Sequence, residues 1–175
     1  PFKISDQATE NLAGRFERRR IDHGVFEGDP YKELQELGFL ASVKHKKLPG
    51  RPIPLNPTEL KHLKKFRELP RSAMARVGDD RVRNRAIIKS IGNLDPEWPV
   101  LVFAGSVAHA QALAAILVLK DVPAVAITAE TGAAARRHQI EQFRSGDIRV
   151  LTNYGVLTEG FDAPKVRAVC IARPT

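Results

Sequence analysis

The short run Gly160-Phe161-Asp162-Ala163-Pro164 combines residue types that could hold a nucleotide. Glycine lets the backbone approach a phosphate with no side chain in the way, and an aspartate two residues later can accept hydrogen bonds from ribose hydroxyls. The same Gly-x-Asp-x-Pro order also encodes a tight turn before an edge strand. Taken by itself, this run favours the turn over the ligand site.

Sequence patterns of several self-sufficient catalytic sites do not occur in the chain. There is no G-x-x-x-x-G-K-[ST] or G-x-G-x-x-G loop to cradle phosphates. The H-E-x-x-H metal motif and the G-x-S-x-G nucleophile elbow are also missing. The five histidines show no ligand spacing, and we expect His109 and His138, which fall in predicted helices, to be packed or solvated. We therefore do not expect these 175 residues to catalyse a reaction alone.

Positive charge is concentrated in the middle of the chain. The formal net charge is +8, and residues 41–90 contain 14 basic and 4 acidic side chains, against 6 and 8 in residues 1–40 and 8 and 8 in residues 91–175. A basic stretch of this kind can meet a polyanion or form a solvated helix face. Composition leaves both possibilities open.

The remaining composition indicates a cytoplasmic protein. Cys170 is the single cysteine, which excludes an intrachain disulfide and a cysteine-based metal site and fits a reducing compartment. No apolar run approaches the roughly 18 residues of a membrane span, and the N-terminus lacks the charged-then-apolar order of a signal peptide.

From residue 94 onward, short apolar runs alternate with amphipathic stretches, as in repeated strand–helix units. Helices are predicted at 107–120, capped by Ser106, and at 132–144. Strands are predicted at 100–103, 124–127, 149–152 and 166–171. Strands separated by helices of this length pair in parallel with right-handed crossovers. The pattern thus predicts an α/β fold, a parallel sheet with helices on both faces.

The first 93 residues are polar, helix-prone and interrupted by prolines, which cannot sit inside helices. We predict a possible strand at 40–47 and N-caps at Asn56 or Thr58 and at Asp79. Helices are predicted near 5–20, 30–37, 57–68 and 79–91. The chain therefore divides, in this interpretation, into a helix-rich connector and lead-in over 1–93 and an α/β lobe over 94–175.

Three blocks in the second part resemble superfamily-2 helicases and translocases. Residues 148–175 resemble motif V, residues 100–106 resemble motif IV, and residues 128–146 look like the segment between them. The stretch 15–48 looks like the connector that leads into this lobe in DEAD/DEAH-like DNA helicases. Thr158-Glu159-Gly160-Phe161-Asp162 is similar to the R/T-E-G-x-D of the excinuclease and type III restriction branch.

The resemblance implies a RecA-like fold of the P-loop NTPase type, specifically the second helicase lobe, and it implies a role for several side chains. Gly160 and Asp162 would bind ATP at the interface between the two lobes. Small polar side chains and Arg136 would grip the nucleic-acid backbone without reading sequence. The residues in matching places are Ser106, Thr128, Thr152 and Asn153. Ser106 could equally be a plain helix cap, Thr152 a strand end and Arg136 a solvated arginine.

Parts that this family needs for ATP hydrolysis are absent from the sequence. The family's first lobe supplies the glycine loop, its lysine and the magnesium-binding carboxylates, and the second lobe supplies arginines in a later Q-x-x-G-R-x-x-R block, motif VI. Neither set occurs here, and Tyr154-Gly155 stands where many relatives have Thr-Asp. We therefore expect a piece of an ATP-dependent DNA helicase or translocase, truncated before motif VI and inactive alone. ATP, Mg²⁺, single- or double-stranded DNA and the N-terminal lobe of the same polypeptide are its implied cofactors and partners.

Two alternatives remain from the sequence. The chain could be a stand-alone module that binds nucleic acid or a protein partner and has no ATP chemistry. It could also be an unrelated doubly wound enzyme in which Asp162 acts as a base.

Overall fold

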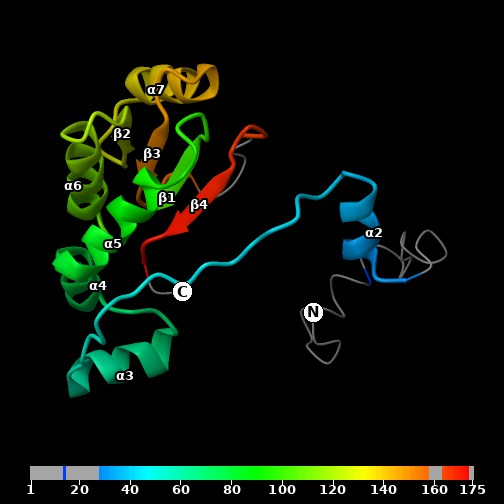
Figure 1. Ribbon diagram of the computed structural model, residues 1–175. Helices are drawn as coiled ribbons and strands as arrows, with labels where there is room; N and C mark the ends of the chain where they lie inside the picture. The colour runs from blue at the N-terminus through cyan, green and yellow to red at the C-terminus, as the bar shows by residue number, and fades with distance from the viewer. Residues whose placement is uncertain (1–13, 15–27, 158–162, 174–175) are drawn as a thin grey trace. The chain divides into compact units, whose positions relative to one another are not determined.

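A computed structural model describes residues 14, 28–157 and 163–173 of the chain (Figure 1). The chain divides into two compact units, Pro1–Lys46 and Lys47–Thr175. Within the described ranges, no helix combines the length and the apolar character that crossing a bilayer requires.

In the first unit, one helix is described. Helix α2 (Pro30–Glu36) begins at Asp29, whose carboxylate accepts a hydrogen bond from the backbone N–H of Tyr31 at 3.0 Å. This confirms the helix predicted at 30–37, whereas the helix predicted at 5–20 lies outside the described residues. The possible strand at 40–47 is wrong, because all of its side chains are exposed and it pairs with no described strand. A strand needs both a pairing partner and a face to bury.

The second unit begins with three helices, of which α4 was not predicted. They are α3 (Pro57–Phe66), α4 (Arg71–Asp79) and α5 (Arg81–Gly92). Helix α3 starts at Asn56, whose side chain accepts from the N–H of Glu59, while the Glu59 carboxylate accepts from the N–H of Asn56. This reciprocal capping box satisfies two backbone donors that the helix itself cannot.

The boundary between α4 and α5 corrects one predicted cap. Asp80, not Asp79, caps α5, because its side chain accepts from the N–H groups of Val82 and Arg83. Helix α4 starts at Pro70 with no side-chain cap, so the sequence carries no polar signal for its beginning. The predicted helix 79–91 therefore corresponds to α5 alone.

Four short parallel strands form one sheet in the order β2-β3-β1-β4. They are β1 (Val100–Phe103), β2 (Ala124–Ile127), β3 (Val150–Asn153) and β4 (Ala168–Ile171). In the register of the sheet, Phe103 of β1 lies opposite Asn153 and Ile171, and Ile127 of β2 also lies opposite Asn153. The carboxyl ends of all four strands therefore meet at one edge.

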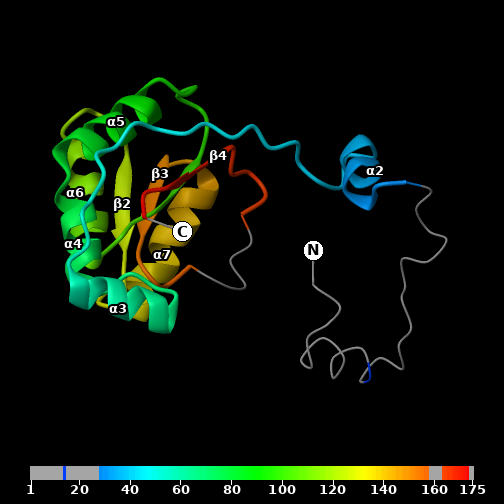
Figure 2. The same cartoon turned by 90° about the horizontal axis from the view of Figure 1, so that it is seen from below.

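Helices cover both faces of this sheet, as predicted. Figure 2 shows α4, α5 and α6 (Val107–Val118) on one side and α7 (Ala133–Ser145) on the other. Because side chains alternate along a strand, Val100 and Val102 pack with α5 and α6, whereas Leu101 packs with Phe143 of α7. Burying each such side chain contributes about 1.5–3 kcal/mol, so the two apolar clusters hold the layers together.

Strand β4 lies at the edge of the sheet. Cys170 and Ala168 pack against the cluster formed with α5 and α6, while Val169 and Ile171 are more than half exposed on the opposite face. Burial raises the pKa of the Cys170 thiol to about 11. Helix α7 therefore covers β2 and β3 more fully than it covers β4.

Candidate functional site

Three of the predicted contact residues meet at the carboxyl edge of the sheet. Ser106 follows β1, Thr128 follows β2, and Asn153 is the last residue of β3. The parallel register brings these strand ends level with one another. Ligands of open parallel sheets bind at this edge, where the loops converge. Gly160 and Asp162 lie outside the described residues.

Ser106 begins helix α6, which confirms its predicted capping role. Its hydroxyl oxygen accepts a hydrogen bond from the backbone N–H of His109 at 3.1 Å. A serine hydroxyl has two acceptor sites and one proton to donate, so this cap leaves the proton available. The half-buried Ser106 side chain can therefore cap the helix and donate to an anion at the same time.

The imidazole of His109 fixes the loop that precedes Ser106. The backbone N–H of Gly105 lies 3.2 Å from His109 Nδ1, and His109 Nε2 lies 2.9 Å from Asn84 Oδ1. A backbone N–H can only donate, so Nδ1 accepts and the neutral ring carries its proton on Nε2. The sequence predicted a packed or solvated histidine here, and the bridge was not predicted.

The bridge continues from helix α5 into α4. The Asn84 side chain donates to the carbonyl of Gly78 at 2.6 Å. A Cβ at Gly78 would lie 3.0 Å from the Cβ of His109, so a side chain at this position would require His109 to shift by a few tenths of an ångström. Burial lowers the pKa of His109 from its ordinary value, and the nearby charge of Arg83 lowers it further, while Asp79 opposes the shift.

A second loop, after β2, is held by Arg136. Its Nη2 donates to the carbonyls of Thr128 at 3.2 Å and Thr131 at 3.1 Å. The Thr128 hydroxyl accepts from the N–H of Glu130 at 3.3 Å, and the N–H of Thr128 donates to the hydroxyl of Thr131 at 3.0 Å. Arg136 thus folds back from α7 and shapes this loop.

The side chains of Thr152 and Asn153 are fully buried. The Thr152 hydroxyl donates to the carbonyl of Ala110 at 2.8 Å, which ties β3 to helix α6. The Asn153 amide donates to the carbonyl of Val102 at 3.1 Å, while its Oδ1 has no partner among the described residues. Both side chains therefore act inside the fold, and a contact between either of them and a ligand stays a prediction.

Tyr154-Gly155, the departure from the family pattern, forms the turn that leaves β3. The φ of Gly155 is 70°, which lies in the left-handed region that most residues with a side chain disfavour. Glycine adopts this φ without strain, and aspartate is among the few other residues that tolerate it, as Asp121 does at a φ of 58°.

The ligand set of a metal ion is not present in the part of the chain that the structure describes. Within that part, no group of three or more His, Cys, Asp or Glu side chains is arranged to hold one. The described carboxyl edge instead offers backbone amides, hydroxyls and a guanidinium, which are donors for an anion.

Sequence comparison identifies helicases as relatives, in agreement with the resemblance noted from the motifs. Residues 83–175, just over half of the chain, match the family model described as the helicase conserved C-terminal domain. Over 75 residues the chain is 32% identical to a Saccharomyces cerevisiae protein described as an ATP-dependent helicase, IRC3. That alignment covers 43% of this chain and 11% of the yeast protein.

Solved structures of similar fold include two archaeal proteins. The helicase domain of Hef from Pyrococcus furiosus matches with a TM-score of 0.51 and 19% identity over 66% of this chain and 23% of that one. A DEAD box protein from Methanococcus jannaschii has a TM-score of 0.48 and 24% identity over 53% of this chain and 25% of that one. The likeness to Hef confirms the predicted fold class, the RecA-like second lobe.

Proposed function

The chain belongs to the family of helicase conserved C-terminal domains, and from that premise we propose that it forms the second lobe of an ATP-dependent DNA helicase or translocase. The observation that carries the proposal is the convergence of the Ser106 and Thr128 loops at one edge of the sheet. Because the chain spans only 11% of its yeast relative, the activity of the whole protein is part of this proposal.

The proposed grip on the nucleic-acid backbone uses donors that do not distinguish bases. The Ser106 hydroxyl donates no hydrogen bond to a described residue, and the first amides of α6 carry the positive end of the helix dipole. A phosphate at this position would accept from both. Such contacts fix the position on a strand without reading its sequence.

The other predicted contacts divide into two groups. Arg136 would hold the Thr128 loop in the shape that faces the phosphates, because its Nη2 is bonded to two carbonyls of that loop. We propose that Thr152 and Asn153 support the grip indirectly, by fixing β3 between α6 and β1.

The ATP site would be shared with the N-terminal lobe of the same polypeptide. Gly160 and Asp162 would contribute from this chain, by the backbone approach and the hydrogen-bonding capacity described above. The Mg²⁺ ligands and the phosphate-binding loop would come from that other lobe, with residues 1–93 as the connector and lead-in. ATP turnover by this chain alone would contradict this division.

Substitutions at Ser106 test the grip. Ser106→Asp keeps a good N-cap but places a negative charge where a phosphate would lie, so we expect about tenfold weaker binding of single-stranded DNA. Ser106→Gly removes the hydroxyl and costs only a few tenths of a kcal/mol as a cap, so it should weaken binding less. Fluorescence anisotropy with a labelled oligonucleotide measures both.

The matched control is Asn93→Asp, which adds the same charge to an exposed residue after α5, at the opposite edge of the sheet. Its affinity should equal that of the wild type. Equal affinities of Ser106→Asp and the wild type would overturn the proposed grip. The same titration with an RNA oligonucleotide decides between DNA and RNA.

A further inference from the structure

Helix α3 carries exposed cations, and an exposed aromatic ring lies at its C-terminal end, beside the face that the lysines share. The α3 surface consists of exposed side chains in the last two turns of the helix and just after it, namely Lys61, Lys64, Lys65, Phe66 and Arg67. Phe66 is 55% exposed, and the ammonium of Lys65 lies 5.1 Å from the centre of its ring. Residues three and four apart share a helix face, so Lys61, Lys64 and Lys65 form one row.

Local acids do not neutralise this surface. Residues 41–90 contain four acidic side chains, and two of them, Glu59 and Asp80, pair with Arg76 at 2.8 Å and with Arg83 at 3.7 Å. No cation of the α3 surface has an ion-pair partner among the described residues. The exposed side chains of Lys61, Lys64, Lys65 and Arg67 therefore face solvent, and the exposed Glu68 is the one acid next to them in the sequence.

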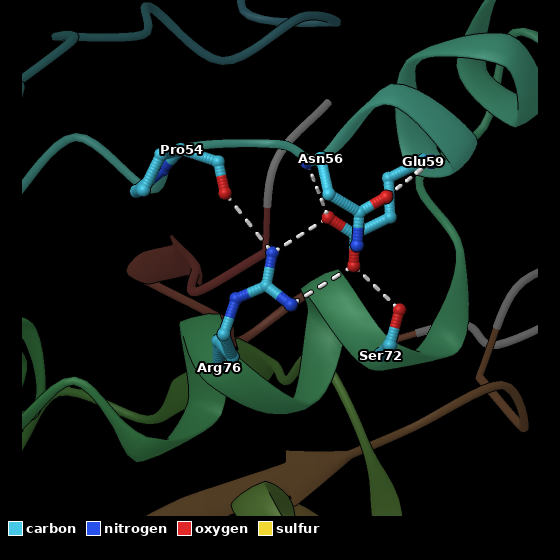
Figure 3. Close-up of polar contacts among 5 residues, drawn as sticks. All are labelled: Pro54, Asn56, Glu59, Ser72 and Arg76. Carbon is cyan, nitrogen blue, oxygen red and sulfur yellow. Dashed lines mark hydrogen bonds and ion pairs between the residues drawn. The ribbon is translucent and has the colours of Figure 1, made fainter.

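A polar joint fixes α3 on α4 (Figure 3). Both oxygens of the Glu59 carboxylate accept from Arg76, at 2.9 and 2.8 Å, and the Ser72 hydroxyl donates to the same carboxylate at 2.6 Å. Arg76 also donates to the carbonyl of Pro54 at 3.1 Å. These hydrogen bonds lower the pKa of Glu59 to about 2. A charge-assisted bidentate pair of this kind holds α3 in a defined orientation.

The joint places the α3 surface near the carboxyl edge of the sheet. Figure 1 shows α3 beside α4, at the end of the sheet toward which the arrowheads of β1 and β4 point. A Cβ at Gly105 would lie 3.4 Å from the Met74 side chain of α4, so α4 reaches the loop of Ser106. The family match begins at residue 83, and α3 lies outside it.

We propose that the α3 surface is a second binding site for single-stranded nucleic acid, with phosphates on the lysine row and a base stacked on Phe66. A basic face with an exposed ring is the arrangement that binds single strands without sequence preference. An acidic protein surface would match the charge but would make no special use of an exposed aromatic ring. The proposal rests on the proposed function only for the class of ligand, because its residues are separate from the Ser106 edge.

The lysine row is tested by the salt dependence of binding. Binding of a fluorescein-labelled oligothymidylate to the 175-residue chain is titrated over a series of salt concentrations. Each phosphate contact with a single strand contributes about 0.7 to the slope of log affinity against log salt, so K61A/K64A/K65A should lower the slope by about 2.

The control K89A/K120A/R167A removes the same charge from exposed positions near the opposite edge of the sheet. We expect it to leave the slope almost unchanged. Equal loss of slope in the two triple variants would overturn the proposal, because it would show that only net charge matters.

Phe66 is tested by comparing single-stranded with duplex DNA. F66A should weaken oligothymidylate binding about tenfold and leave duplex binding unchanged, because only unpaired bases can stack on the ring. F66W should keep the affinity, and F66L should behave as F66A does. Hydrogen exchange of the α3 amides in each variant checks that α3 stays folded.

Two other outcomes separate this inference from the proposed function. If α3 variants bind as the wild type does while Ser106→Asp binds weakly, the second site is wrong and the edge site stands; docking of α3 on an acidic protein would give this result. If α3 variants lose affinity while Ser106→Asp does not, the second site stands and the edge site is wrong. A wild-type chain that binds no oligothymidylate at low salt overturns both.

Discussion

Two regions of the second unit are held together by different physics. Between the sheet and helices α5 and α6, fully or nearly fully buried aliphatic side chains such as Ile87, Leu113 and Leu117 supply the contacts. Between α3 and α4, hydrogen-bonded polar groups contribute contacts, as in the pair of Glu59 with Arg76, and α4 also buries Ala73 and Val77. The hydrogen bond between His109 and Asn84 is also a polar contact, although His109 is buried.

Apolar contacts and hydrogen bonds therefore have different roles in this unit: the first stabilise the fold, and the second set the positions of loops and helices. Apolar burial is non-directional and roughly proportional to area, so it stabilises the layers without fixing loop geometry. Hydrogen bonds contribute less net free energy but demand defined distances and angles. Hydrogen bonds of this kind position the loops of Ser106 and Thr128 and helix α3, the parts that we propose to bind nucleic acid. Three substitutions test whether the regions behave so differently.

The largest effect should come from the apolar region. Leu117→Ala in α6 removes a side chain with 0% exposure and leaves a cavity, so we expect the free energy of unfolding to fall by about 2–5 kcal/mol. Leu119→Ala, two residues away, truncates a leucine that is 84% exposed and should change little. Urea denaturation measures both, and equal losses would mean that α6 does not pack as described.

An intermediate effect should come from the His109 bridge. His109→Leu leaves the N–H of Gly105 and the Oδ1 of Asn84 without partners, which should cost about 1–3 kcal/mol at pH 7.5. The exposed His138 is the matched control, and His138→Leu should change stability little.

The bridge also predicts a pH dependence. The pKa of His109 is lowered in the fold from its ordinary 6.5, so the unfolded chain binds the proton first as pH falls. The wild type should therefore lose part of its stability from about pH 6.5 downward, and His109→Leu should not lose that part. Parallel pH profiles of the two proteins would contradict the described bridge.

The smallest global effect should come from the joint of α3. Glu59→Gln weakens the pairing with Arg76 and should release α3 locally while the sheet stays intact. Hydrogen exchange should show faster exchange of α3 amides at pH 7 and unchanged protection of β1 and β3. Loss of protection across the sheet would show that the two regions are not independent.

The sign of the pH effect at Glu59 follows from its pKa. The pKa falls from 4.5 to about 2 in the fold, so the contribution of Glu59 is complete above about pH 4.5 and is lost as pH falls toward 2. Protection of α3 in the wild type and in Glu59→Gln should therefore converge near pH 2.

The fold was predictable from the sequence where patterns are local. The apolar runs of β1 and β2 and the Ser106 cap of α6 gave correct elements, because period and capping depend on neighbours in the chain. Helix α4 was missed since it begins at Pro70 with no side-chain cap. The segment wrongly predicted as a strand at 40–47 has exposed side chains throughout and pairs with no described strand.

The site was predictable only in outline. Residues at strand ends could be assigned to one edge, because parallel strands end together. That Thr152 bonds to Ala110, or that His109 meets Asn84 across 25 positions of sequence, depends on how layers pack, and no local pattern encodes it. The sequence identified polar residues at the strand ends, but it did not show that Thr152 and Asn153 are buried while Ser106 is partly exposed.

The thiol of Cys170 on strand β4 makes this chain convenient for spectroscopic labelling. Because burial raises its pKa to about 11, this thiol is almost entirely protonated at neutral pH. A cysteine introduced at an exposed position would have an ordinary pKa near 8.5, so a larger fraction of it would be ionised and it would react faster with maleimide dyes. A fluorophore or spin label can therefore be attached to the chain selectively while Cys170 remains in place.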